Sequence, residues 1–169
     1  MARAAKERKV PLLVCTLPWN MRDMPPRGSL PLEDPAFFRA WRHFELREYG
    51  KAAADFRVGL AFDPGIDAFV RRRLEAFGHY YLARSLDSLG ILSAARNHYQ
   101  ASLEAQVPPM PRLNRVIRRV CGEEGLALAD LERAFADASP GGLVGFPLFE
   151  DDMHWDRAAD PLVAAVIVE

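Results

Sequence analysis

The sequence predicts a helix-dominated α/β protein in which a long helical segment interrupts a small parallel sheet. Two continuous apolar runs, at residues 10–17 and 126–129, are typical of buried parallel strands. Between them, residues 35–107 carry apolar side chains at helical spacing. The expected organisation is therefore a first α/β segment at 1–32, a helical insert at 33–107 and a second α/β segment at 108–169.

Composition excludes several classes of function. Of the 169 residues, 50% are hydrophobic, and 22 Lys and Arg balance 23 Asp and Glu, so a net charge of −1 offers no general attraction to nucleic acid or an anionic membrane. No apolar run approaches the ~20 residues that span a bilayer. Cys15 and Cys121 lack metal-type spacing and suggest buried thiols in a reducing compartment. We therefore expect a cytoplasmic protein without cofactor.

The first segment consists of one strand and a loop. Residues 10–17, bounded by charge and proline, predict a strand buried on both faces. Residues 18–29 contain several prolines and predict an irregular loop. Loops at the carboxyl ends of parallel strands often bind ligands in α/β proteins.

The helical insert begins at Asp34-Pro35, a favourable helix start. Its residues 48–64 and 81–99 resemble two copies of a tetratricopeptide repeat. In that alignment Ala52 matches Ala95 and Phe56 matches Tyr99, and a small residue followed by an aromatic one predicts close helix packing. The copies are farther apart than usual, so we expect extra residues around 65–75. Such repeats bind peptides, which makes a peptide a possible partner.

The second α/β segment alternates helices with one strand. A helix with the stripe Leu113, Val116, Ile117 and Val120 should precede the strand at 126–129 and a short helix at 131–136. Asp156 is expected to cap a last helix reaching residue 168. Two strands alone leave two unpaired edges, so a missing N-terminal half or another protein is expected to complete the sheet.

Asp151 and His154 are the candidate catalytic residues. A histidine can take the proton of a nucleophile while a carboxylate fixes its tautomer. From the spacing alone, an acidic surface turn is favoured over a catalytic pair. Metal binding with Glu150 and Asp152 is disfavoured, because the remaining histidines lie in the repeat helices rather than at ligand spacing.

The sequence offers no convincing nucleophile. Ser29 follows Gly28 in a proline-rich loop rather than a strand, and Ser139 precedes Pro140 in a turn. No Gly-x-Ser-x-Gly elbow, phosphate loop or dinucleotide fingerprint occurs.

Several motifs, in order along the chain, resemble a subgroup of GDSL/SGNH-type hydrolases that carries tetratricopeptide-like helices. They lie at residues 14–26, 114–118, 128–130, 138–142 and 148–154. The resemblance implies a partial flavodoxin-like sheet, with His154 as the catalytic base and Asp151 as the triad acid. It places the serine nucleophile and the oxyanion-hole glycine and asparagine in an N-terminal half outside this sequence.

Two departures from the family pattern stand near the site, at Trp155 and at Asp160-Pro161. The sequence thus predicts the C-terminal part of an ester hydrolase or acyl-transfer protein, inactive alone. The alternatives are a tetratricopeptide-type interaction module and, less favoured for want of a nucleophile, a stand-alone hydrolase.

Overall fold

The computed structural model describes residues 2–62 and 65–168, and the chain divides into two compact units. The sheet unit combines the residues up to Asn20 with those from Met110 onward, whereas the helical unit is Met21–Pro109. The proline-rich loop after Asn20 thus belongs to the helical unit, although the sequence grouped residues 1–32 together. A helix-dominated chain with a small parallel sheet is confirmed.

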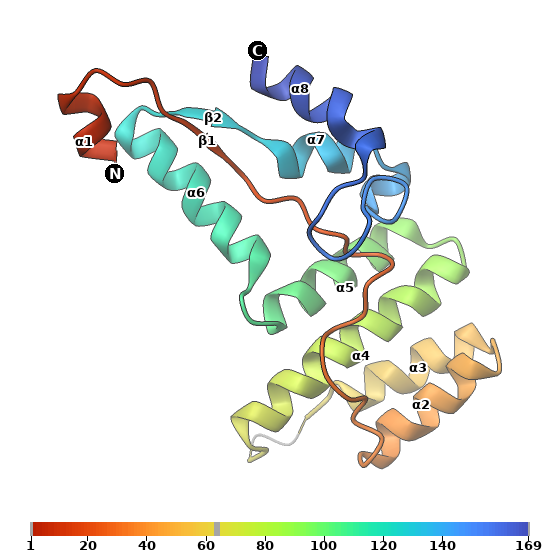
Figure 1. The fold of residues 1–169 in the computed structure, drawn as a ribbon. Coiled ribbons are helices and arrows are strands. Elements are labelled where there is room, and N and C mark those ends of the chain that lie inside the picture. The colour runs from red at the N-terminus through yellow and green to blue at the C-terminus, as the bar shows by residue number, and fades with distance from the viewer. Residues whose placement is uncertain (1, 63–64, 169) are drawn as a thin grey trace. The chain divides into compact units, whose positions relative to one another are not determined.

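The sheet has two strands, which lie side by side in Figure 1. Strand β1 (Leu13–Cys15) runs parallel to β2 (Ala127–Ala129), with Val14 opposite Leu128. The predicted pairing of these two distant segments is therefore confirmed. A short helix, α1 (Ala2–Glu7), precedes β1, and α6 (Met110–Glu124) packs against both strands.

Residues 10–17 were predicted to form a strand buried on both faces, and residues 126–129 a buried strand, and both predictions are wrong. Leu13 is 41% exposed and Leu128 is 36% exposed. A strand in a wide parallel sheet is covered by neighbours at its edges and by helices on its faces. In the described part of the chain each strand has only one neighbour, so apolar side chains remain in contact with water.

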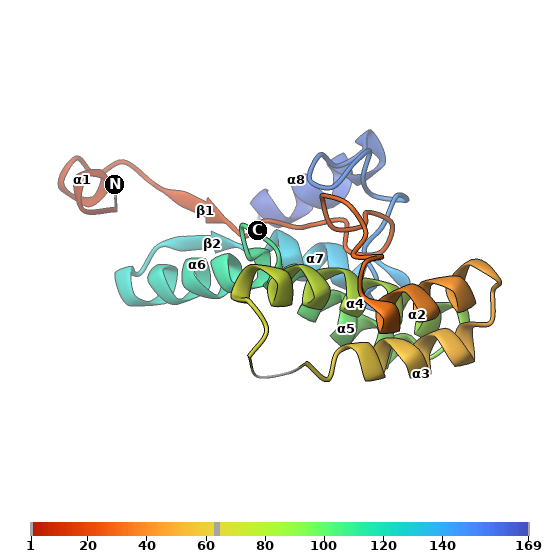
Figure 2. The same ribbon diagram turned by 90° about the horizontal axis from the view of Figure 1, so that it is seen from below.

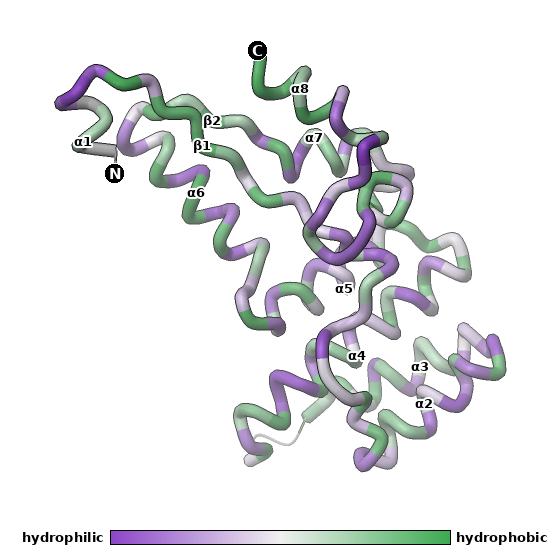
Figure 3. The backbone as a smooth tube through the Cα atoms, in the orientation of Figure 1, coloured by the Kyte–Doolittle hydropathy of each residue, from purple (hydrophilic) through white to green (hydrophobic). Residues whose placement is uncertain are grey.

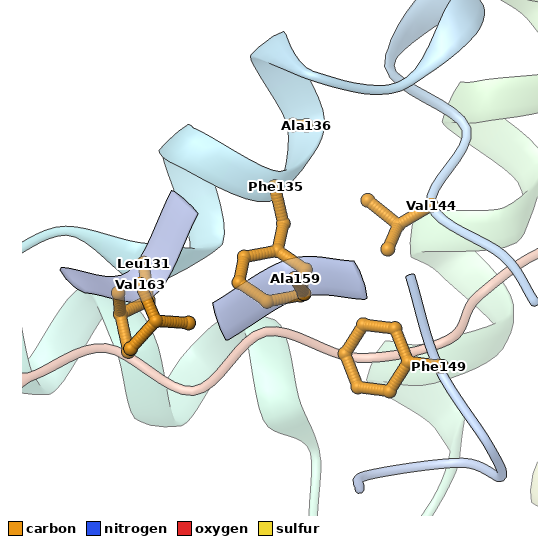
Figure 4. Packing of buried hydrophobic residues seen from close by; sticks show 7 residues of the cluster. All are labelled: Leu131, Phe135, Ala136, Val144, Phe149, Ala159 and Val163. Carbon is orange, nitrogen blue, oxygen red and sulfur yellow. The ribbon is translucent and has the colours of Figure 1, made fainter. Parts of the chain in front are cut away.

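The core of the sheet unit lies among its C-terminal elements. These are α7 (Leu131–Asp137), the 3-10 helices at Pro140–Gly142 and Arg157–Ala159, and α8 (Asp160–Val168). Figure 4 shows the cluster, in which Phe135 and Phe149 pack with ring centroids 5.3 Å apart. The other buried members are Leu131, Ala136, Val144, Ala159 and Val163.

Capping groups begin and end several elements of this unit. Asp130 accepts a hydrogen bond from the N–H of Arg133 at the start of α7, and Asp156 caps the 3-10 turn that leads into α8. Gly125 adopts a positive φ of 61° after α6, which lets the N–H of Leu126 bond to the carbonyl of Cys121. The chain thereby reverses directly into β2.

Much of the apolar surface of the sheet unit is uncovered. Helix α8 is hydrophobic along most of its length in Figure 3, yet only Val163 is buried and Val168 is 85% exposed. The predicted stripe on α6 is also partly in solvent, with Leu113, Val116 and Val120 exposed. A helix that is apolar all round is normally buried, so the exposure of α8 departs from what its composition predicts.

The helical unit consists of two helical hairpins, shown in Figure 2. Helices α2 (Pro35–Glu45) and α3 (Tyr49–Gly59) form the first, and α4 (Ala68–Ser88) and α5 (Leu92–Ala105) form the second. Asp34 caps α2 by accepting the N–H of Phe37 at 2.8 Å, as predicted.

The helix contacts bury the residues that the repeat pattern singled out. Ala52, Ala95 and Tyr99 are fully buried and Phe56 is 1% exposed, which confirms the predicted burial of these four side chains. The extra residues expected around 65–75 extend the N-terminal end of α4, which has 21 residues. Positions 63 and 64 lie outside the described residues.

Ion pairs attach the proline-rich loop to the helices within this unit. Arg22 forms a bidentate pair with Asp87 at 2.8 and 3.0 Å, and Tyr80 donates a hydrogen bond to the carbonyl of Arg22. Arg73 donates to the carbonyl of Ser29 and pairs with Glu33. None of the helices in the described ranges is both long and apolar enough to cross a membrane.

Candidate functional site

Asp151 and His154 form a hydrogen-bonded pair in the acidic loop, defined as Glu150–His154. The Nδ1 atom of His154 lies 2.7 Å from Oδ2 of Asp151. The other carboxylate oxygen, Oδ1, accepts the backbone N–H groups of Met153 at 2.9 Å and His154 at 2.7 Å. Both predicted residues therefore meet, and the carboxylate binds the turn and the imidazole together.

The loop is closed at its base by backbone pairing. Phe149 and Trp155 form an isolated antiparallel bridge, and the N–H of Glu150 donates to the carbonyl of His154 at 2.8 Å. Phe149 is buried in the core cluster, so the base of the loop is fixed by apolar packing. Beyond this base, the side chains of Met153 and His154 are exposed to water, whereas that of Asp152 is buried.

The pair perturbs the protonation of both members. The hydrogen bond from His154, followed by the two backbone N–H groups, lowers the pKa of Asp151 to about 2. The same hydrogen bond and the charge of Asp151, with smaller contributions from Asp152 and Glu150, raise the pKa of His154. Asp151 is therefore a carboxylate near neutrality, and it favours the imidazolium form of His154.

This arrangement can support acid–base chemistry at Nε2. With Nδ1 held by a carboxylate, Nε2 is the ring atom left to take or return a proton, as in a Ser-His-Asp triad. The side chain of His154 is 71% exposed, so a reacting group can approach it. The geometry supplies a base and its orienting acid.

The hydroxyl groups of the sheet unit are used in the fold. Thr16 is fully buried, donates to Asp130 at 2.9 Å and accepts the N–H of Glu132. Ser139 donates to the carbonyl of Phe135 at 2.8 Å. Since Thr16 and Ser139 are the serine and threonine residues of this unit, its described part offers no activated hydroxyl beside His154.

The other histidines have partners within the helical unit. His79 on α4 and His98 on α5 stack, with their Nδ1 atoms 3.0 Å apart, whereas His43 contacts Glu48. Among the described residues, no three histidine, cysteine or acidic side chains gather in a way that could hold a metal ion.

Sequence reasoning missed the part played by Asn20. Its side-chain amide donates to the carbonyl of Asp151 and its backbone N–H donates to the carbonyl of Asp152, each at 3.1 Å. The available signal was one polar residue near the start of the proline-rich loop, which did not reveal a contact with the distant acidic loop.

No protein-family model matches the chain, and neither a curated protein nor a solved structure matches it. The structure itself therefore defines only a small α/β unit that carries a hydrogen-bonded carboxylate–imidazole pair.

Proposed function

We propose that the chain supplies the general base and the orienting acid of a GDSL/SGNH-type ester hydrolase or acyl-transfer site. In this proposal His154 is the base and Asp151 the acid, and the nucleophile comes from another polypeptide segment. The observation that carries it is the 2.7 Å contact between Nδ1 of His154 and the Asp151 carboxylate. Without serine and oxyanion donors, a base and an acid contribute little, so the chain alone is expected to be inactive.

The exposed apolar surface around β1 and β2 supports this proposal. Leu13, Leu17 and Leu128 are all exposed in or next to the sheet. A further strand pairing with either open edge would cover such side chains and satisfy its backbone groups. We propose that the polypeptide that brings the nucleophile also completes the sheet. Free thiols at Cys15 and Cys121 are consistent with a cytoplasmic location.

The test is complementation of the full chain. A polypeptide carrying a Gly-Asp-Ser-Leu segment and its strands would be coexpressed with it, and the product assayed on short acyl esters and with a fluorophosphonate probe. Activity is expected only in the complex, and both His154→Ala and Asp151→Asn should abolish it. His43→Gln, which changes a half-buried histidine outside the sheet unit, should leave it intact.

Two results would overturn the proposal. One is turnover by the chain alone that disappears in His154→Ala, since a complete site would then be present. The other is complemented activity that is indifferent to both Asp151 and His154, which would make the acidic loop a surface turn.

A tetratricopeptide-type interaction module is the second candidate. It is favoured by the equivalent burial of Ala52 with Phe56 and of Ala95 with Tyr99 in the two hairpins. Peptides selected from a random library on the full chain should then shift NMR signals of α2–α5, and His154→Ala should not affect binding. Selected peptides that shift only the signals of the sheet unit would contradict this candidate.

A further inference from the structure

Asn20 makes an unusual double contact with the acidic loop. The residue is fully buried. Its side-chain Nδ2 donates to the carbonyl of Asp151, and its backbone N–H donates to the carbonyl of Asp152. Two consecutive carbonyl groups of the loop are therefore held by a single residue that is 131 positions away in the sequence.

The direction of these two carbonyl groups determines where the loop turns. The carbonyl of Asp151 is fixed by the same backbone rotation that sets the path into Met153 and His154. Along that path the two backbone N–H groups reach Oδ1 of Asp151, and the imidazole reaches Oδ2. If the peptide between Asp151 and Asp152 rotated, the carboxylate and the imidazole would separate.

The side chains of the pair cannot hold the imidazole in place by themselves. The side chain of His154 is largely in solvent, and the side chain of Asp151 is 45% exposed. An exposed ion pair between mobile side chains is weak, because ordering both side chains costs entropy. The pair is therefore held through the backbone of the acidic loop, to which the buried side-chain amide of Asn20 donates a hydrogen bond.

We infer that Asn20 is a positioning residue, which orients the Asp151 carboxylate toward Nδ1 of His154 through its hydrogen bonds to the loop backbone. Its role in a reaction rests on the proposed function, whereas the positioning can be tested without any activity. An amide suits the position because it carries a short neutral donor. A carboxylate there would lack the donor and would repel Asp151 and Asp152.

The test is the titration of the His154 imidazole, followed by NMR in the full chain and assigned with His154→Ala. The wild-type pKa should lie above the ordinary histidine value, and Asp151→Asn should remove that elevation. Asn20→Leu, which keeps the branching and the number of side-chain heavy atoms but has no donor, should remove at least half of it. Asn20→Ala should do the same, and either variant serves if the other fails to fold.

Asn114 provides a matched control. It is also fully buried in the sheet unit, but its amide bonds both backbone groups of Leu17 rather than the acidic loop. Asn114→Ala should leave the His154 titration unchanged. Wild-type titration in the folded Asn20 variants, or an equal fall of the pKa in Asn114→Ala, would overturn the inference.

The titration tests the positioning role of Asn20 separately from the proposed function. If Asn20→Leu lowers the His154 pKa but the complemented activity is unchanged by His154→Ala, the positioning role is supported and the hydrolase proposal fails. If complemented activity needs His154 while the Asn20 variants titrate as wild type, the hydrolase proposal stands and the positioning role fails.

Discussion

Acid should destabilise the helical unit through the imidazole pair of His79 and His98. The two rings stack between α4 and α5 with centroids 5.2 Å apart. Burial, and then the neighbouring His98, lowers the pKa of His79 to about 4. Burial, and then the guanidinium of Arg57 on α3, lowers the pKa of His98. Both rings are therefore neutral in the folded protein at physiological pH.

The sign and size of the effect follow from linkage. Histidine in the unfolded chain titrates near 6.5, so between that pH and about 4 the unfolded chain binds more protons. The contribution of the neutral ring to stability is therefore fully present above the unfolded pKa, and it is lost as the pH drops through this window. The shift of His79 corresponds to roughly 3 kcal/mol before screening. Because the ring is only partly buried, solvent screening reduces this to about 1–2 kcal/mol.

Urea unfolding followed by Trp41 fluorescence measures this change. Trp41 is the tryptophan of the helical unit, so Trp19→Phe and Trp155→Phe make the signal specific to that unit. Unfolding at about pH 7 and about pH 5 spans the titration of histidine in the unfolded chain while leaving most carboxylates ionised. Because pH 5 lies inside the window between about 6.5 and about 4, the free energy of unfolding should be roughly 0.5–1 kcal/mol lower at the acid pH.

The double variant His79→Phe/His98→Phe keeps two stacked rings without titrating groups, and it should lose most of this pH dependence. His154→Gln, in the other unit, should retain it. If the double variant stays as acid-sensitive as the parent, the pair does not cause the effect and the linkage reasoning is refuted.

Three further predictions concern packing and local charge. Ala52→Leu should lower the free energy of unfolding of the helical unit by about 1–3 kcal/mol through overpacking. The control Ala54→Leu, on the exposed side of α3, should change it by less than about 0.5 kcal/mol. Equal effects of the two variants in urea unfolding would contradict the assigned packing. Phe135→Ala should cost about 3–5 kcal/mol in the sheet unit, measured through Trp155 fluorescence, and a near-neutral result would disprove its central place in the core. Arg118→Ala should raise the pKa of Asp130, followed by carboxyl carbon NMR, because its guanidinium is the main cause of the lowered value; an unchanged titration would exclude that pair.

The sequence predicted the position and pairing of the two strands better than their burial. Residues 10–17 and 126–129 are apolar runs of strand length, and their pairing required only the rule that crossover connections join parallel strands. Their expected burial failed because burial depends on how many neighbours a strand has. A local pattern carries no information on that number, and β1 and β2 have one neighbour each in the described chain.

The candidate site was predicted in the same partial way. The spacing of Asp151 and His154 is local, and a turn of three residues readily brings them together. The support from Asn20 depends on a contact between segments that are far apart in the chain. The stacking of His79 with His98 likewise depends on the packing of α4 on α5, which the helix periodicity predicts without fixing its register.

The exposure of the acidic loop bears on how His154 can act as a base. In solvent, the Asp151 carboxylate raises the pKa of the imidazole and so stabilises the protonated form, which cannot accept a proton. A polypeptide covering the loop would remove water from the ring, and desolvation favours the neutral base. The same cover would strengthen the attraction between Asp151 and the imidazolium formed in the reaction. An open pair thus has the connectivity of a catalytic dyad, while in the proposed hydrolase an efficient base requires a partner that encloses the site.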